Sequence, residues 1–171
     1  MKKEPSGDAV DLIIGQWRRE RPDLDVAPMA TIGRVKRCSA LLRRRLDETF
    51  SAFGMSGWEF DVLATLRRSG APYSLTPTAL FGTLMITSGT MTQRLKGLES
   101  RGLVRRVAHS GDARSTLVQL SEAGLTLIDR ALTAHVQNEQ RLLAPFKPSD
   151  LAALDLRLSK LLLSLEGMRS S

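Results

Sequence analysis

Polar and basic side chains in residues 83–120 have the types and spacing needed to contact the bases and phosphates of DNA. We expect a helix that Thr87 or Ser88 caps, that Gly102 ends, and that buries three apolar residues: Met91, Leu95 and Leu98. The other face of this helix would then carry small, polar and basic residues: Ser88, Gly89, Thr90, Thr92, Gln93, Arg94 and Lys96. Glutamine can pair with an adenine edge, arginine with guanine, and threonine hydroxyls with phosphate or base.

The segment after this helix is expected to form a β-hairpin with a basic turn. Strands are predicted at Leu103–Ala108 and Ser115–Leu120, and Gly111 permits the turn between them. Arg114 would project into a minor groove, where the negative potential favours arginine, and Asp112 could hold its guanidinium. A helix, a strand, a basic turn and a second strand form the pattern of a winged helix-turn-helix, in which the helix enters the major groove. The pattern therefore predicts binding to duplex DNA.

Apolar spacing predicts helices on both sides of this unit. We expect helices over 8–20, from about Pro28 to Phe53, one after a Ser56 cap, and one starting at Thr76 and Pro77. Two more follow caps at Ser121 and Ser149. This predicts a mainly α fold with a small hairpin, divided into N-terminal helices (1–53), a DNA-binding lobe (54–120) and C-terminal helices (121–171). The terminal helices are apolar enough either to close a dimer or to pack on the chain's own core.

Composition is consistent with a basic globular protein of the cytoplasm. The 171 residues carry a net charge of +7, which favours a polyanionic partner such as DNA. The start M-K-K lacks the apolar run of an export signal, and no segment is apolar enough to predict a membrane span. The single cysteine, Cys38, fits a reducing compartment. Catalytic and metal-binding motifs are not found, so we expect neither an enzyme nor a metal site.

Several motifs together resemble the MarR family of transcriptional regulators. They are L-T-P-T-A-L, T-S-G-T-M-T-Q-R-L-K-G-L-E-S-R-G-L-V-R-R, D-A-R and V-Q-L-S-E-A-G, within a resemblance that spans about Met29 to Leu165. The resemblance implies a homodimer joined by its N- and C-terminal helices, with winged-helix lobes on a pseudo-palindromic operator. It also implies repression that a small ligand relieves, and no cofactor beyond that effector.

A narrower resemblance is to the urate-responsive PecS/HucR subgroup. It rests on the extra leading helix with Trp17 and on E-F-D-V-L-A-T-L-R-R-S-G. By position it implies a purine site at Trp17, Asp61 and Arg106. Asp61 and Arg106 could pair in the empty site, and an anionic planar ligand would compete for Arg106, repel Asp61 and stack on Trp17. The alternative is a structural ion pair with Trp17 in the core.

Other interpretations have less support from the residues. Cys38 could sense oxidants, but with no second cysteine a small core residue is the more common role. His109 and His135 are too far apart for a metal site, and His135 is expected in the core or an interface. A nucleoid-type protein without a ligand, and a winged helix that binds protein or RNA, remain as alternatives.

Overall fold

The computed structural model describes the backbone of residues 7–84, 88–109 and 112–168, and the side chains of these residues except 88–91, 109 and 112–115. The elements in chain order are α1 (Ala9–Glu20), α2 (Ala27–Ser51), α3 (Gly57–Arg68), β1 (Ser74–Leu75), α4 (Pro77–Leu84), α5 (Ser88–Ser100), β2 (Val104–His109), β3 (Asp112–Leu120), α6 (Glu122–Leu143) and α7 (Pro148–Gly167). Contacts divide the chain into two units, Met1–Glu48 and Thr49–Ser171, each described by itself.

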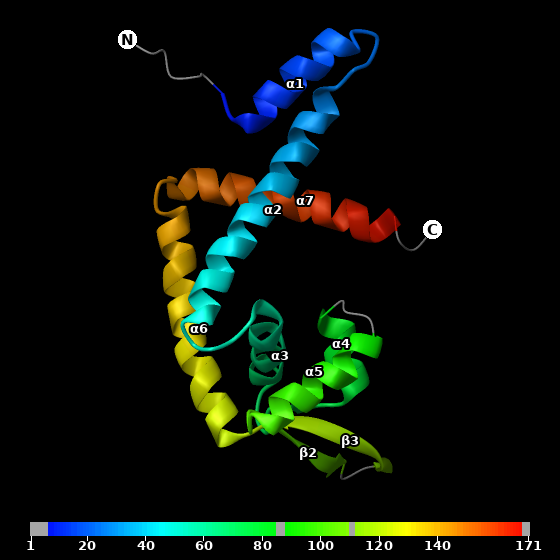
Figure 1. The fold of residues 1–171 in the computed structure, drawn as a ribbon, viewed down its shortest axis with the longest axis vertical. Helices are drawn as coiled ribbons and strands as arrows, with labels where there is room; N and C mark the ends of the chain where they lie inside the picture. Colours follow the sequence, from blue (N-terminus) through cyan, green and yellow to red (C-terminus); the bar gives the residue numbers. More distant parts are fainter. Residues whose placement is uncertain (1–6, 85–87, 110–111, 169–171) are drawn as a thin grey trace. The chain divides into compact units, whose positions relative to one another are not determined.

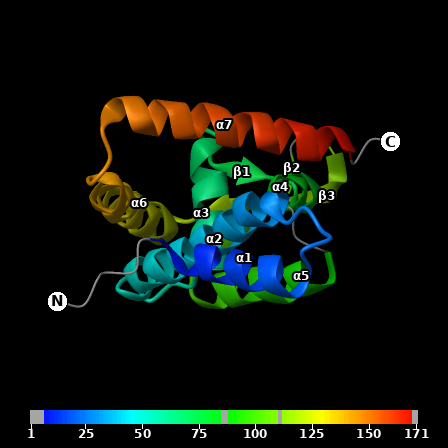
Figure 2. The same ribbon diagram turned by 90° about the horizontal axis from the view of Figure 1, so that it is seen from above.

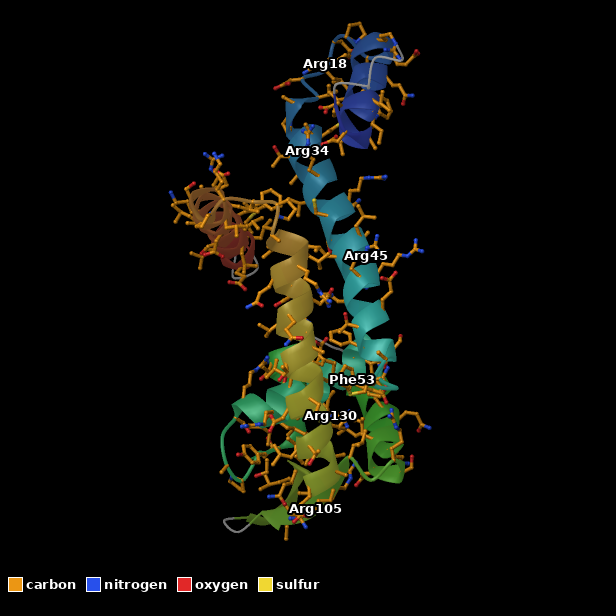
Figure 3. All side chains as sticks on the ribbon, turned by 90° about the vertical axis from the view of Figure 1, so that its left-hand side faces the viewer. Arg18, Arg34, Arg45, Phe53, Arg105 and Arg130 are labelled. Atoms are coloured by element: carbon orange, nitrogen blue, oxygen red, sulfur yellow. The ribbon has the colours of Figure 1, made fainter. Side chains whose placement is uncertain are left out.

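The first unit joins α1 to the first part of α2 by a small apolar cluster and an arginine clamp. Val10 and Ile14 pack with Val26. The Arg34 guanidinium, labelled in Figure 3, donates to the carboxylate of Asp8 at 2.7 Å and to that of Asp11 at 2.6 Å. Asp8 and Asp11 also form the capping box of α1, so the same two carboxylates start α1 and hold it to α2.

Helix α3 is the centre of the second unit. It contacts α4, α6 and β3 (Figure 1). Its inward residues Val62, Leu63 and Leu66 are fully buried, as their spacing predicts. The rest of this core comes from the surrounding elements: Leu80, Leu95, Leu98, Val118 and Ile128. One apolar core therefore fixes α4, α5, the sheet and α6 to α3.

The strands β2 and β3 follow α5 and form, with β1, a three-stranded antiparallel sheet in the order β1-β3-β2. Two strands are predicted from the sequence, and β1 is a third strand that was not predicted. Ser74 and Leu75 pair with Gln119 and Val118. A two-residue strand has too little alternation to be recognised from sequence. β3 also begins at Asp112, earlier than the predicted Ser115, and the ladder has an irregularity between Ala108 and His109.

The junction between the hairpin and α6 is close-packed. The Leu103 carbonyl accepts from the Ser121 amide at 3.1 Å, and the Ser121 hydroxyl donates to the Gly102 carbonyl at 2.6 Å. Ser121 caps α6, as predicted, by accepting from the Gly124 amide. A Cβ on Gly124 would lie 2.0 Å from the Leu103 oxygen, so only glycine fits there. The S-E-A-G motif is thus the point where α6 joins the hairpin.

Aromatic residues connect the end of α2 to α3 and α6 within the second unit. The rings of Phe50 and Phe60 are stacked with centroids 4.2 Å apart. The imidazole of His135 lies 4.8 Å from the Phe60 centroid and 5.4 Å from that of Phe50. Its Nε2 is 3.2 Å from a Glu139 carboxylate oxygen. His135 is therefore packed among rings, in the core position expected of it.

Helix α7 follows α6 (Figure 2) and begins at the end of α6 that lies away from the sheet (Figure 1). Its N-cap is Lys147, with Pro148 in the first turn, so the predicted cap at Ser149 was wrong. Proline suits the first turn because the amide it lacks would have no helical partner there. No residue of α7 is buried. Cys38 on α2 is exposed, which corrects its expected place in the core.

Within the part of the chain that the structure describes, no helix combines the length and apolar character that a membrane crossing requires. The same residues contain no group of three or more His, Cys, Asp or Glu side chains arranged to hold a metal ion.

Candidate nucleic-acid interface

Helix α5 is held by its buried face and by the turn that follows its C-terminal end. Leu95 and Leu98 are buried, as predicted. The chain turns out of the helix at Gly102, two residues after Ser100, with a φ of +68°, a left-handed conformation that glycine adopts without strain. The Leu103 amide then donates back to the Leu98 carbonyl at 3.0 Å. The chain therefore leaves α5 directly into β2, and the helix and the hairpin form adjacent parts of one surface.

The outer face of α5 carries polar and basic side chains. Thr92, Gln93 and Lys96 are exposed. Ser88 and Thr90 belong to the same helix, but their side chains, like that of Met91, lie outside the described residues. The exposed set has the donors and acceptors that a major groove requires. We call Thr92, Gln93 and Lys96 the outer face of α5.

Arg94 differs from its expected place on this face. It is half-buried, and its Cζ lies 5.1 Å from the centroid of the Trp58 ring at the start of α3. Arg94 precedes the buried Leu98 by one helical turn, so it belongs to the flank of α5 that faces α3. The structure therefore places Arg94 beside the outer face rather than at its middle.

The hairpin positions its basic residues through a regular ladder near its base. Arg105 of β2, labelled in Figure 3, pairs with Gln119 of β3, and its Nε donates to the Gln119 side chain at 2.9 Å. Gln119 in turn donates to the Pro72 carbonyl. Asp112 and Arg114 lie in β3, but their side chains and the predicted turn at Gly111 lie outside the described residues.

A nearly buried carboxylate connects α3 to the end of α5. Glu59 accepts from the Ser56 amide and hydroxyl, each at 2.8 Å, which completes a capping box for α3. Its other oxygen accepts from Arg101 at 2.5 Å, and Arg101 also donates to the Gly54 carbonyl. Burial raises the pKa of Glu59, but the hydrogen bonds from Ser56 and the charge of Arg101 outweigh it, so the pKa lies below its usual value.

The three residues predicted to hold a ligand lie on β2 (Arg106), α3 (Asp61) and α1 (Trp17). The Arg106 guanidinium donates to the two oxygens of Glu99 on α5, at 3.1 and 3.3 Å. Asp61 lies exposed on α3. Trp17 belongs to the first unit, where it is 43% exposed on α1 and therefore is not the plain core residue of the alternative interpretation. Arg106 thus ties β2 to the flank of α5 opposite Arg94.

Four residues of this surface were absent from the sequence prediction: Trp58, Glu59, Glu99 and Arg101. The capping box of Ser56 and Glu59 was readable as S-x-x-E before an apolar run. The contacts of Arg94 with Trp58 and of Arg101 with Glu59 join residues far apart in the chain, and local patterns do not show them.

This arrangement of two helices, an exposed polar face and an adjoining hairpin defines a winged helix-turn-helix DNA-binding protein. The chain belongs to the MarR family: the family model matches residues 53–115. It is 49% identical over 138 residues to the transcriptional regulator PecS of Dickeya dadantii, covering 81% of this chain and 83% of that protein. MarR-family proteins are DNA-binding regulators of transcription and not enzymes.

Solved structures agree with this assignment. A mutant MarR from E. coli complexed with operator DNA is 26% identical, with a TM-score of 0.69 and coverage of 80% of this chain and 97% of that one. AbsC, a MarR-family regulator from Streptomyces coelicolor, has the same fold, with a TM-score of 0.73 at 23% identity and coverage of 84% and 97%. The predicted winged-helix fold is confirmed, with β1 as an additional strand.

We predict that Glu59→Gln lowers the free energy of unfolding by about 1–3 kcal/mol at neutral pH, because it weakens charge-assisted hydrogen bonds. The pKa of Glu59 is depressed in the folded state, so its contribution is present above the usual value near 4.5 and is lost as pH falls through the folded value. Urea unfolding at about pH 7 and about pH 3.5 should therefore show a larger difference between the two proteins at the higher pH.

The control is Glu48→Gln, because Glu48 pairs with Arg44 and Arg45 at the surface. Such exposed pairs contribute about 0–1 kcal/mol, so little change is expected. Equal stability of wild type and Glu59→Gln at neutral pH would show that Glu59 does not hold α5.

Proposed function

We propose that this DNA-binding regulator is a cytoplasmic repressor. It binds a pseudo-palindromic operator as a homodimer and is released by a small anionic ligand such as urate. The observation that carries the DNA-binding part is the outer face of α5, exposed above the buried Leu95 and Leu98 and next to the hairpin. Support also comes from the likeness to E. coli MarR, a relative solved with operator DNA. In this proposal 1–53 and 121–171 form the dimer and 54–120 reads DNA.

On DNA, α5 would lie in the major groove and the hairpin would reach the adjacent minor groove. Gln93 suits an adenine edge, and Lys96 suits a phosphate. Ser88, Thr90 and Thr92 would supply short polar contacts, and Arg114, held by Asp112, would enter the minor groove. Arg94 would reach a base from the flank of the helix.

We predict that Gln93→Ala loses about 1–3 kcal/mol on the operator but little on a scrambled duplex, because only a base contact carries sequence information. Lys96→Ala should weaken both duplexes equally and reduce the salt slope by about 1. The measurement is a fluorescence-anisotropy titration at several salt concentrations, on an operator selected from random duplexes.

Lys147→Ala serves as the control. It removes a positive charge at the start of α7, which is not part of α5 or of the β2–β3 hairpin. If Gln93→Ala weakens operator and scrambled DNA alike, Gln93 does not read bases. If the selection from random duplexes yields no preferred sequence, the result favours a nucleoid-type protein over an operator-binding repressor.

The homodimer is supported by apolar surface that a single chain leaves uncovered. α7 has no buried residue, although its leucines repeat every three or four positions. The exposed ones include Leu154, Leu158, Leu162 and Leu165. On α2 the residues Met29, Ile32, Val35 and Leu42 are also more than one-third exposed. Helices gain most of their stability by packing an apolar face, so a second copy is the fitting partner for these faces.

We predict a mass of two 18.8-kDa chains by multi-angle light scattering. Leu162→Glu should shift the protein towards monomer and weaken operator binding, because it places a charge in the apolar stripe of α7. Ser164→Glu adds the same charge outside the stripe and should leave the dimer intact. A wild-type protein that remains monomeric at micromolar concentration would exclude the dimer.

The ligand contacts are proposed at Asp61 and Arg106 of the second unit, with Trp17 of the first unit as a further candidate. Support comes from the 49% identity to PecS and from the position of Arg106, which contacts Glu99 on the helix proposed to read DNA. An anionic ligand that took the Arg106 guanidinium would release Glu99, and α5 would lose its tie to β2. Trp17 presents an exposed aromatic side chain, which suits stacking on a planar ring.

We predict that urate weakens operator binding and that Arg106→Gln blunts this response. Arg105→Gln is a matched control, because Arg105 is the next residue of the same strand and contacts Gln119 instead. The response is the ratio of operator Kd values with and without urate. Calorimetry without heat on urate addition, with heat on addition of xanthine or salicylate, would replace urate by that effector. No heat with any of them would exclude this site.

A further inference from the structure

The contact between Arg94 and Trp58 joins the flank of α5 to the first turn of α3. The Arg94 Cζ lies 5.1 Å from the indole centroid, within the range of a cation–π interaction. Both side chains are half-buried. Tryptophan has the aromatic face that attracts a cation best, and arginine is the cation found there most often. The pair is therefore an attractive contact that restricts a long and otherwise mobile side chain.

A second contact lies just beyond the C-terminal end of α5. Arg101 is the first residue after the helix and follows Arg94 by seven residues. Arg101 is held by Glu59, the neighbour of Trp58 in the sequence, and the buried Leu98 lies between the two arginines. The start of α3 thus holds α5 at two points. One uses a carboxylate and the other an aromatic ring.

The two arginines differ in how many of their N–H donors are used in these contacts. Arg101 donates its N–H groups to Glu59 and to the Gly54 carbonyl. Arg106, on the other side of α5, donates to Glu99. A contact with an aromatic face consumes none of the five N–H donors of a guanidinium. Arg94 is therefore restrained in position while its hydrogen-bonding capacity remains available to a partner beside the outer face of α5.

We propose that Trp58 is a positioning residue for DNA recognition, whose indole holds the Arg94 guanidinium at the edge of the outer face of α5, ready to pair with a guanine. Trp58 itself does not touch DNA in this arrangement. The gain comes from ordering Arg94 before binding, so that less conformational freedom is lost in the complex. This inference rests on the proposed function, specifically on base reading by Arg94.

The test measures the ratio of affinities for operator and scrambled duplex in a double-mutant cycle of Trp58 and Arg94. Trp58→Leu keeps an apolar side chain but removes the aromatic face, and we expect it to lower the ratio about two- to fivefold. Trp58→Phe keeps a ring and should retain most of the ratio. Arg94→Ala should lower the ratio further. In the Arg94→Ala protein, Trp58→Leu should then have no additional effect, because the residue it positions is gone.

The matched control is Tyr73→Leu. Tyr73 lies under another guanidinium, that of Arg67, at 4.9 Å, and Arg67 also pairs with Asp129 on α6 and not with α5. Loss of this second cation–π contact should leave the affinity ratio unchanged. Thermal unfolding of each variant reports any general loss of stability.

The outcomes separate this inference from the function on which it rests. If Arg94→Ala lowers the ratio and Trp58→Leu does not, Arg94 reads DNA without help from Trp58, and only the inference fails. If Trp58→Leu lowers the ratio equally with and without Arg94, Trp58 acts through general packing, and the inference fails again. If Arg94→Ala leaves the ratio unchanged, base reading by Arg94 is wrong and the inference falls with it.

Discussion

The carboxylate of Glu59 accepts hydrogen bonds from Ser56, the N-cap of α3, and from Arg101 just beyond the end of α5. It lies almost out of contact with water, with 11% of its side chain exposed. An ionised carboxylate in such a place is stable only when its oxygens are satisfied, so the two helices must meet in one geometry. The Arg101 bond to the Gly54 carbonyl adds the end of α2 to the same point. The direction of α5, and hence the surface it offers, depends on this contact.

Helix α5 is held on one side by contacts with α3 and on the other side by a contact with β2. Towards α3 lie Arg94 and, just beyond the end of the helix, Arg101. Towards β2 lies Glu99, which binds Arg106. Between them the outer face is free of the packing that fills the helix's inner side. This separation explains how α5 can be held on both sides and still present polar groups. Rigid presentation limits the entropy that a binding surface loses when it meets its partner.

Much of this fold could be predicted from local patterns. Spacings of three and four located the helices, because an apolar stripe must meet a core, and Gly102 and Ser121 marked helix ends through turn and capping chemistry. β1 could not be found, because it exists only through its pairing with β3. Proline in the first turn moved the start of α7 to Lys147, one more boundary that local propensity leaves open.

The candidate site was predictable to a different degree. The helix that carries Gln93 and Lys96 follows from amphipathic spacing, so their exposure could be expected. The place of Arg94 could not, because it is set by Trp58, which lies 36 residues earlier and is brought near by the tertiary fold. The same holds for Arg106, whose contact with Glu99 depends on the exact path of the chain through Gly102. Periodicity indicates which face of a helix is polar, but it does not indicate which residues of that face contact another element.

The junction at Gly102, Leu103, Ser121 and Gly124 has a mechanical consequence. Because α6 begins against the backbone that links α5 to β2, with no room even for a methyl group, these elements cannot pivot independently at that point. A rotation of α6 would therefore move α5 and the β2–β3 hairpin together. An event that rotates α6 could therefore change how the outer face of α5 meets DNA without contacting that face.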